Sequence, residues 1–188
     1  AGLKSTAATT FSYSLINKQT QDWQAEATSL LNSLQRLSDA SSMAVARREN
    51  ARTNHVPRLL PRGWDSAELK SVKISQSTNY EEALHGYEGM AKEYDDLVRR
   101  SEILRQTEIE VFNLHGEVAA ILGMIRTHPF ASRASSDIDV IQARYAAEPG
   151  TNAPPTMLYD SKKTLTSIRD DSRGLLSELN AAAAKHSI

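Results

Sequence analysis

Residues 83–125 read ALHGYEGMAKEYDDLVRRSEILRQTEIEVFNLHGEVAAILGMI, and this stretch decides the fold. No proline interrupts it, and apolar residues recur in it at alternating intervals of three and four residues. We call this series the heptad row; it consists of Ala83, Tyr87, Met90, Tyr94, Leu97, Ser101, Leu104, Glu108, Val111, His115, Val118, Leu122 and Ile125. Ten of these thirteen positions are apolar or aromatic. The row predicts a long helix with one side covered by other helices.

The positions of the prolines extend this prediction to the rest of the chain. All six lie outside three long stretches, which we predict to be helices over about 11–53, 79–127 and 156–184. A shorter apolar cluster after Ser135 predicts a fourth helix over 135–147. We therefore expect an all-α fold, an elongated helical bundle or coiled coil of three long helices and one short helix, with helix content above about 65 %.

The first of these helices carries an apolar stripe of its own. Its residues follow the same spacing of three and four, and they are Ile16, Thr20, Trp23, Ala27, Leu30, Leu34, Leu37, Ser41 and Ala44. The stripe weakens toward its end. It predicts a second helix that needs a neighbour.

The segments between the helices define the expected organisation of the chain. Residues 1–10 are small and polar without a period, so we expect a flexible lead-in, followed by a single domain over 11–188. Residues 54–78 contain Pro57, Pro61 and Gly63, and we expect a long connector there with one short helical turn. Thr78 and Asn79 precede Glu81 and Glu82, a pattern that predicts the start of the second long helix.

Charge suggests how the first two long helices pair. Residues 47–62 contain five arginines against Glu49, whereas residues 81–96 contain six acidic side chains against Lys92. If the helices form an antiparallel hairpin, these oppositely charged segments lie side by side. We therefore predict that helices 11–53 and 79–127 are antiparallel.

Composition narrows the class of protein. The chain has 40 % hydrophobic and 24 % charged residues, a net charge of −1 and no cysteine, which excludes disulfides, thiolate metal sites and cysteine nucleophiles. No apolar run reaches the ~18–20 residues that span a bilayer, and no signal peptide is visible. We expect a soluble protein and favour an intracellular one, in the cytoplasm or nucleus. Because the chain starts at Ala1, we expect a processed product or part of a longer protein.

Catalytic and cofactor motifs are weakly represented. The sequence has no P-loop, no HExxH, no Gly-x-Ser-x-Gly and no glycine-rich dinucleotide motif. Glu82 and His85 have the Glu-x-x-His spacing of di-iron bundles, but only one copy exists, so we favour an exposed helix face. We expect no enzyme activity, no metal site and no cofactor.

Two sets of apolar residues are candidates for partner binding. Val56, Leu59, Leu60 and Trp64 lie on the proline-stiffened segment 56–64, where they either cap a bundle or dock into another protein. Within the heptad row, the candidates are Leu97, Leu104, Val111 and Val118. Gly116 and Gly123, one heptad apart, fit either close approach of a helix or simple tolerance of glycine.

These features favour a non-catalytic protein-interaction module, a structural or scaffolding subunit that binds helical partners through apolar seams, in a homo- or hetero-oligomer. One alternative is a sensory bundle that binds a small ligand between helices at Ser101, Glu108 and His115. Another is an adaptor for nucleic acid or anionic membranes, although the pI near 6.6 disfavours both partners. Its candidate residues are Arg47, Arg48, Arg52, Arg58 and Arg62.

Overall fold

The computed structural model describes residues 2–186, and for residues 2–11, 151 and 186 it describes the backbone alone. Helix makes up 91 % of the structure, and the described residues contain no strand. The predicted all-α class and the predicted helix content are therefore confirmed. Residue 1 of the expected lead-in lies outside the described residues.

The helices match the predicted ranges except at two places. The long helices are α1 (Gly2–Thr53), α4 (Tyr80–Arg126) and α6 (Leu158–His186), and α5 (Ser135–Ala147) has the predicted bounds. Residues 2–10, for which we expected no regular element, belong to α1; they contain no proline, and extending an existing helix is far easier than starting one. The remaining elements are α2 (Val56–Leu59), α3 (Pro61–Ser75) and the 3-10 helices η1 (Ala131–Ala134), η2 (Gly150–Asn152) and η3 (Pro155–Met157).

The chain divides into two compact units. Unit 1 comprises Ala1–Thr53 and Gly63–Asp96, and unit 2 comprises Asn54–Arg62 and Leu97–Ile188. The expected single domain over 11–188 stays a prediction, and each unit is described by itself.

Helix α3 corrects the expected connector over 54–78. Pro61 counted against a helix in the sequence, but it occupies the first position of α3, where its missing N–H and fixed φ are well tolerated. The helix then continues for 15 residues, well beyond the single short turn we expected.

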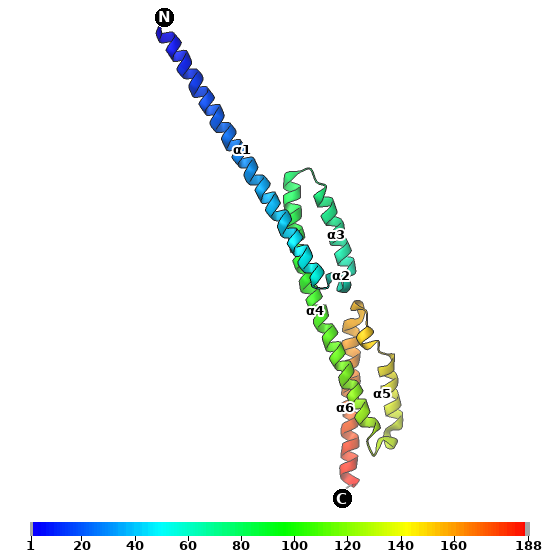
Figure 1. Cartoon of the computed structure of the whole chain (residues 1–188). Helices are drawn as coiled ribbons and strands as arrows, with labels where there is room; N and C mark the ends of the chain where they lie inside the picture. The colour runs from blue at the N-terminus through cyan, green and yellow to red at the C-terminus, as the bar shows by residue number, and fades with distance from the viewer. Residues whose placement is uncertain (1, 187–188) are drawn as a thin grey trace. The chain divides into compact units, whose positions relative to one another are not determined.

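The presence of α3 also changes the pairing of the long helices in unit 1. Figure 1 shows α3 running back along α1, and α4 then running in the direction of α1. The predicted antiparallel pairing of the first two long helices is therefore wrong, because the chain reverses twice between them. Arg47 does reach the acidic segment, at 3.4 Å from Asp95, but Arg48 pairs with Glu68 of α3.

The start of α4 has the predicted capping interactions. The Asn79 side-chain oxygen accepts a hydrogen bond from the backbone N–H of Glu82 at 3.2 Å, and the Ser77 hydroxyl lies 3.3 Å from the Glu82 carboxylate. The Asn79 side chain thus satisfies one of the backbone donors that a helix start leaves open, and the Ser77 hydroxyl accepts a further hydrogen bond from the Asn79 backbone N–H at 3.2 Å.

The interior of unit 1 consists mainly of small side chains. Most of its buried apolar residues are alanines, which let the helices approach closely; they are Ala40, Ala44, Ala51, Ala67, Ala83 and Ala91. Tyr94, which is 1 % exposed, is the largest buried side chain in this unit. Its ring contacts Trp64, with centroids 5.9 Å apart, and its hydroxyl donates to Glu68 at 2.8 Å.

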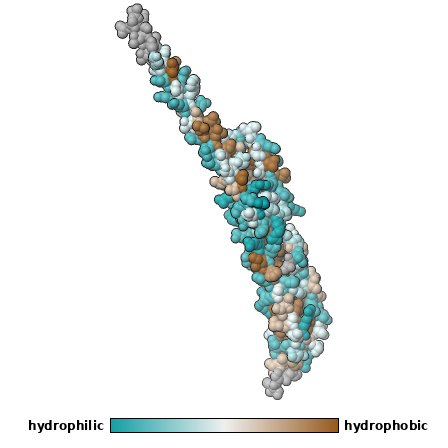
Figure 2. Space-filling view, in the orientation of Figure 1, coloured by the Kyte–Doolittle hydropathy of each residue, from teal (hydrophilic) through white to brown (hydrophobic). Residues whose placement is uncertain are grey.

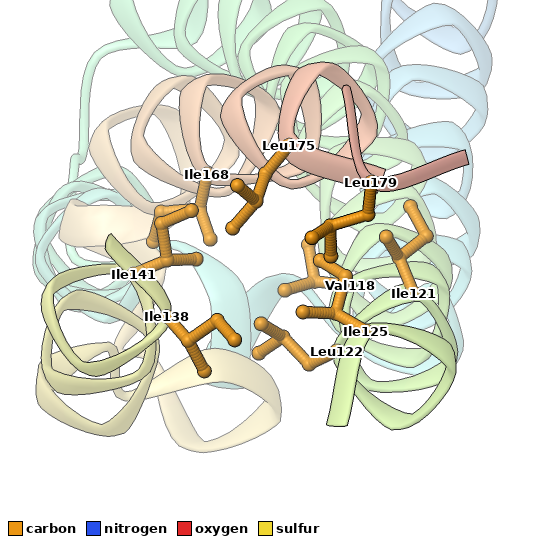
Figure 3. Packing of buried hydrophobic residues seen from close by; sticks show 9 residues of the cluster. All are labelled: Val118, Ile121, Leu122, Ile125, Ile138, Ile141, Ile168, Leu175 and Leu179. Atoms are coloured by element: carbon orange, nitrogen blue, oxygen red, sulfur yellow. The ribbon is translucent and has the colours of Figure 1, made fainter. Parts of the chain in front are cut away.

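The interior of unit 2 is built from larger aliphatic side chains. Figure 3 shows them pointing inward from α4, α5 and α6. They are Val118, Ile121, Leu122, Ile125, Ile138, Ile141, Ile168, Leu175 and Leu179. A second cluster of Val111, Leu158 and Leu165 continues this core.

The heptad row faces the interior throughout. Each of its thirteen members is buried or half-buried, from Ala83 in unit 1 to Ile125 in unit 2. The prediction that this side of the helix is covered by other helices is confirmed, and the chain itself supplies the cover.

Two glycines on α4 give a matched test of helix packing in unit 1. A Cβ atom on Gly86 would lie 2.8 Å from the Ile74 side chain, whereas one on Gly89 would meet nothing within 4 Å. We expect Gly89→Ala to raise the free energy of unfolding by about 1 kcal/mol, the helix-propensity gain. Gly86→Ala should lower it by about 1–3 kcal/mol, because the branched Ile74 side chain has to move.

Urea unfolding followed by circular dichroism at 222 nm measures both changes. Equal effects of the two substitutions would show that Ile74 does not constrain this position.

Candidate interaction surface

A series of large apolar side chains on α1 lies uncovered. Ile16, Trp23, Leu30 and Leu34 are 55 %, 68 %, 61 % and 52 % exposed, and Thr20 and Ala27 between them are also exposed. We call these six residues the uncovered seam. Figure 2 shows hydrophobic side chains on this part of α1.

The same stripe is covered farther along the helix. Leu37 and Ser41 are half-buried, and Ala44 is buried at 5 % exposure, within unit 1. The boundary between exposed and covered positions therefore lies between Leu34 and Leu37. The change reflects where the helices of unit 1 cover α1, since the spacing of the stripe does not change.

The uncovered seam has the chemistry of a helix-binding face. Charged side chains of this part of α1, such as Lys18 and Asp22, occupy outward positions of the heptad. The arrangement matches the anchors at i, i+3, i+4 and i+7 that amphipathic helices use to bind one another. The spacing of this stripe is visible in the sequence, but its residues were not among the predicted partner-binding candidates. The signal that would have marked these residues as candidates is an apolar stripe that extends past the ends of the helices that cover it.

The candidates on segment 56–64 pack within the protein. Val56 and Leu59 are buried at 0 % and 2 % exposure, and Leu60 and Trp64 are half-buried. Trp64 contacts Tyr94, and the Arg48 guanidinium lies 5.8 Å from the centre of its ring. The segment was predicted either to cap a bundle or to dock into another protein. The burial of Val56 and Leu59 fits packing within the protein.

The candidates on the heptad row are likewise covered. Leu97, Val111 and Val118 are buried, and Leu104 is half-buried. Leu104 joins Leu59 and Leu60 in an open groove of about 360 Å³ in unit 2. The other lining residues are Arg100, Ile103, Pro155, Thr156 and Tyr159.

Four of the five candidate anion-binding arginines contact carboxylates. The nearest distances are 3.4 Å for Arg47 to Asp95, 2.5 Å for Arg48 to Glu68, 2.7 Å for Arg52 to Glu49 and 2.8 Å for Arg58 to Glu108. Arg62 is exposed.

The pKa values reflect these pairs. A hydrogen bond from Arg48 holds the pKa of Glu68 below its ordinary value, and one from Arg58 does the same for the pKa of Glu108. The carboxylates thus neutralise part of the positive charge of these arginines, which an anionic ligand would need for binding.

The polar members of the heptad row have partners within unit 2. The Ser101 hydroxyl donates to the Val98 carbonyl at 2.8 Å, and Glu108 accepts two hydrogen bonds from Arg58. The His115 Nδ1 atom lies 2.9 Å from the Tyr145 hydroxyl, where burial raises the pKa of that phenol.

Gly150 packs against the same histidine. Its φ is +55°, and a Cβ atom there would lie 2.5 Å from the His115 ring. Glycine is therefore required beside this pair. Of the three polar positions proposed for a ligand, His115 is therefore engaged in contacts with α5 and η2.

Glu82 and His85 contribute to the local structure of α4. The Glu82 backbone is capped by Asn79, and His85 is exposed, with Glu81 at 4.0 Å and Glu88 at 3.7 Å. No group of three or more His, Asp or Glu side chains in the described part of the chain is placed to hold a metal ion. No described helix is both long enough and apolar enough to cross a lipid bilayer.

No family model matches the sequence, and neither a curated protein nor a solved structure matches it.

Proposed function

We propose that this protein is a non-catalytic protein-interaction module, a structural or scaffolding subunit that binds a partner helix along the uncovered seam. One observation carries the proposal: a heptad stripe that packs inside unit 1 from Leu37 onward continues, with larger side chains, where nothing covers it. An apolar stripe of this kind is ordinarily buried against another helix. We propose that the contact has coiled-coil geometry, because the spacing of three and four is unbroken across the seam.

The seam offers enough apolar surface for specific binding. Full burial of an exposed Leu or Ile side chain contributes about 1.5–3 kcal/mol, and Trp23 adds the large aromatic surface typical of interface anchors. Part of this gain offsets the loss of translational and rotational freedom on association. Trp23 and Leu30, one heptad apart, are the residues we expect to contribute most.

The alternative functions have less support from the described residues. The polar positions proposed for a small ligand are engaged with Asn54, Arg58 and Tyr145. Four of the arginines proposed for an anion contact carboxylates. In the part of the chain that the structure describes, the large apolar side chains of the uncovered seam are more than half exposed.

The test compares two double variants of the full chain as immobilised baits. Trp23→Ala/Leu30→Ala changes the seam, and Ser29→Ala/Asn32→Ala changes exposed residues elsewhere on the same helix. We expect the seam variant to bind the proteins captured by the wild type at least about tenfold more weakly, because anchor residues contribute ~2 kcal/mol or more each. The control variant should bind them as the wild type does.

Thermal unfolding at low protein concentration separates binding from folding. Because the seam residues are exposed, both variants should unfold within a few degrees of the wild type. Equal capture by all three baits would contradict the proposed function.

A further inference from the structure

We infer that the open groove of unit 2 binds a small amphiphilic carboxylate, a molecule that joins one carboxylate group to an apolar body such as an alkyl chain. The groove is a different site from the uncovered seam of α1, and the inference does not depend on the proposed function. It follows from the apolar lining of the groove, from its size and from the one charged side chain beside it.

Three segments that are far apart in the sequence form the groove, and all of them belong to unit 2. The end of α2 supplies Leu59 and the adjoining Leu60. The middle of α4 supplies Arg100, Ile103 and Leu104. The junction of η3 and α6 supplies the remaining lining residues, which are Pro155, Thr156 and Tyr159.

Apolar side chains make up most of the lining. Leu59 is buried at 2 % exposure, and Leu60 and Leu104 are half-buried, whereas Ile103 and Tyr159 are 57 % and 55 % exposed. A ligand in the groove would therefore shield large apolar side chains from water, which is favourable. The volume of about 360 Å³ lies within the range of about 300–1,000 Å³ that is typical of small-molecule sites.

Arg100 is the one charged residue of the lining, and its charge is uncompensated. Among the described side chains, no carboxylate forms an ion pair with it, and Arg100 is exposed. Other arginines of unit 2 do contact carboxylates; they include Arg58, Arg144 and Arg173.

The chemistry of Arg100 selects the head group of the ligand. A planar guanidinium can donate two parallel hydrogen bonds to one carboxylate. The hydroxyl groups of Thr156 and Tyr159 are further hydrogen-bond donors in the lining. One positive charge beside an apolar groove thus matches a molecule with one carboxylate and an apolar body.

The size of the groove favours a small molecule over a segment of another protein. A specific protein interface uses about 20–30 residues on each side. The groove is lined by eight residues, so it is far smaller than such an interface. A few polar groups in a mostly apolar lining are also typical of small-molecule sites.

Isothermal titration calorimetry of the full chain with sodium decanoate tests the inference, with every probe kept below its micelle-forming concentration. Acetate supplies the carboxylate without the apolar body, and decyltrimethylammonium supplies the same alkyl chain with the opposite charge. We expect one decanoate to bind per chain. The other two probes should bind at least about tenfold more weakly, because each lacks one of the two contacts.

Two matched variants assign the site. Arg100→Gln should weaken decanoate binding about fivefold, the effect of one charge-assisted contact in an open groove. Arg126→Gln removes the same charge from an exposed position of α4 outside the groove, and it should leave the affinity unchanged. Because both arginines are exposed, both variants should unfold within a few degrees of the wild type.

A third variant tests the apolar part of the site. Ile103→Asn replaces an exposed apolar side chain of the lining by a polar one, and it should weaken decanoate binding by at least about threefold.

Each other outcome overturns the inference. Absence of decanoate binding, or equal affinity of Arg100→Gln and the wild type, would show that Arg100 holds no carboxylate. Equal binding of decanoate and decyltrimethylammonium would show that the groove accepts any alkyl chain. An acidic, leucine-rich peptide that binds more tightly than decanoate and displaces it would assign the groove to a protein partner.

The seam variant separates this inference from the proposed function. Trp23→Ala/Leu30→Ala should bind decanoate as the wild type does while it loses the captured proteins. Failure of decanoate binding would leave the capture result as it is, and failure of capture would leave the groove as it is.

Discussion

Replacement of Ile125 by alanine will lower the free energy of unfolding of unit 2 by about 2–5 kcal/mol. The Ile125 side chain is 0 % exposed and lies in the cluster formed by α4, α5 and α6. The substitution removes three buried carbon atoms and leaves a cavity that the surrounding helices fill only in part. Most natural domains have a stability of only about 5–15 kcal/mol, so the loss is a large fraction of the total.

Met124 provides the matched control, because it is the preceding residue of the same helix and is 51 % exposed. Met124→Ala should change the free energy of unfolding by no more than about 0.5 kcal/mol. Circular dichroism at 222 nm during urea unfolding measures both variants. Similar losses for the two would mean that the side of α4 placed inward here is not the side that stabilises the protein.

Tyr94→Ala will have an effect of similar size in unit 1, about 3–5 kcal/mol by analogy with other aromatic truncations. The core of this unit is mainly alanine, so Tyr94 supplies an unusually large share of its buried surface. Small neighbours cannot expand to fill the space that the ring leaves. The change should be followed by Trp64 fluorescence, because Trp64 contacts the Tyr94 ring. A Trp23→Phe background makes Trp64 the single tryptophan.

Tyr94→Phe separates the hydroxyl from the ring. Burial, together with the hydrogen bond donated to Glu68, raises the pKa of Tyr94 to about 12, so the folded state favours the neutral phenol. The stability that follows from this preference is complete below the ordinary tyrosine pKa of about 10 and is lost as the pH rises toward 12.

Tyr94→Phe should therefore unfold less steeply with pH between about 10 and 12 than the wild type does. At neutral pH the variant should lose about 1–2 kcal/mol, since Glu68 keeps its contacts with Arg48. An alkaline unfolding profile identical to that of the wild type would show that the Tyr94 hydroxyl is not shielded from solvent in the folded protein.

The heptad row of α4 could be predicted from sequence because spacing alone specifies which side of a helix is covered. The prediction extended to polar members such as Ser101 and His115, which are buried or half-buried beside their apolar neighbours. Which helix covers the row, and in which direction it runs, could not be predicted from the spacing. An apolar row requires a neighbour but carries no record of its direction, and the predicted antiparallel pairing failed for this reason.

Helix α3 was missed because the effect of proline depends on its position. Pro61 breaks a helix that precedes it but is well placed at the start of one that follows. The predicted connector over 54–78 took account of the first effect and not of the second. The predicted direction of α4 relative to α1 was wrong for the same reason, since an additional helix between them reverses the chain once more.

The interaction candidates show a related limit. Leu97, Val111 and Val118 and the residues of the uncovered seam share the same spacing, yet the first group is buried within the protein and the second is exposed. The difference comes from where the other helices end, and the positions of those helices were predicted only in part. Local patterns therefore predicted which helix faces are apolar, but not which of them remain exposed for a partner.

The position of the uncovered seam along α1 makes recognition separable from folding. The six seam residues stop before Leu37, and the core residues of unit 1 on α1 begin at Ala40. The stretch before Leu37 can therefore be exchanged for a different heptad sequence while the alanine-lined interior is left as it is. Such a graft would give the protein a new binding partner while the fold of unit 1 stays the same.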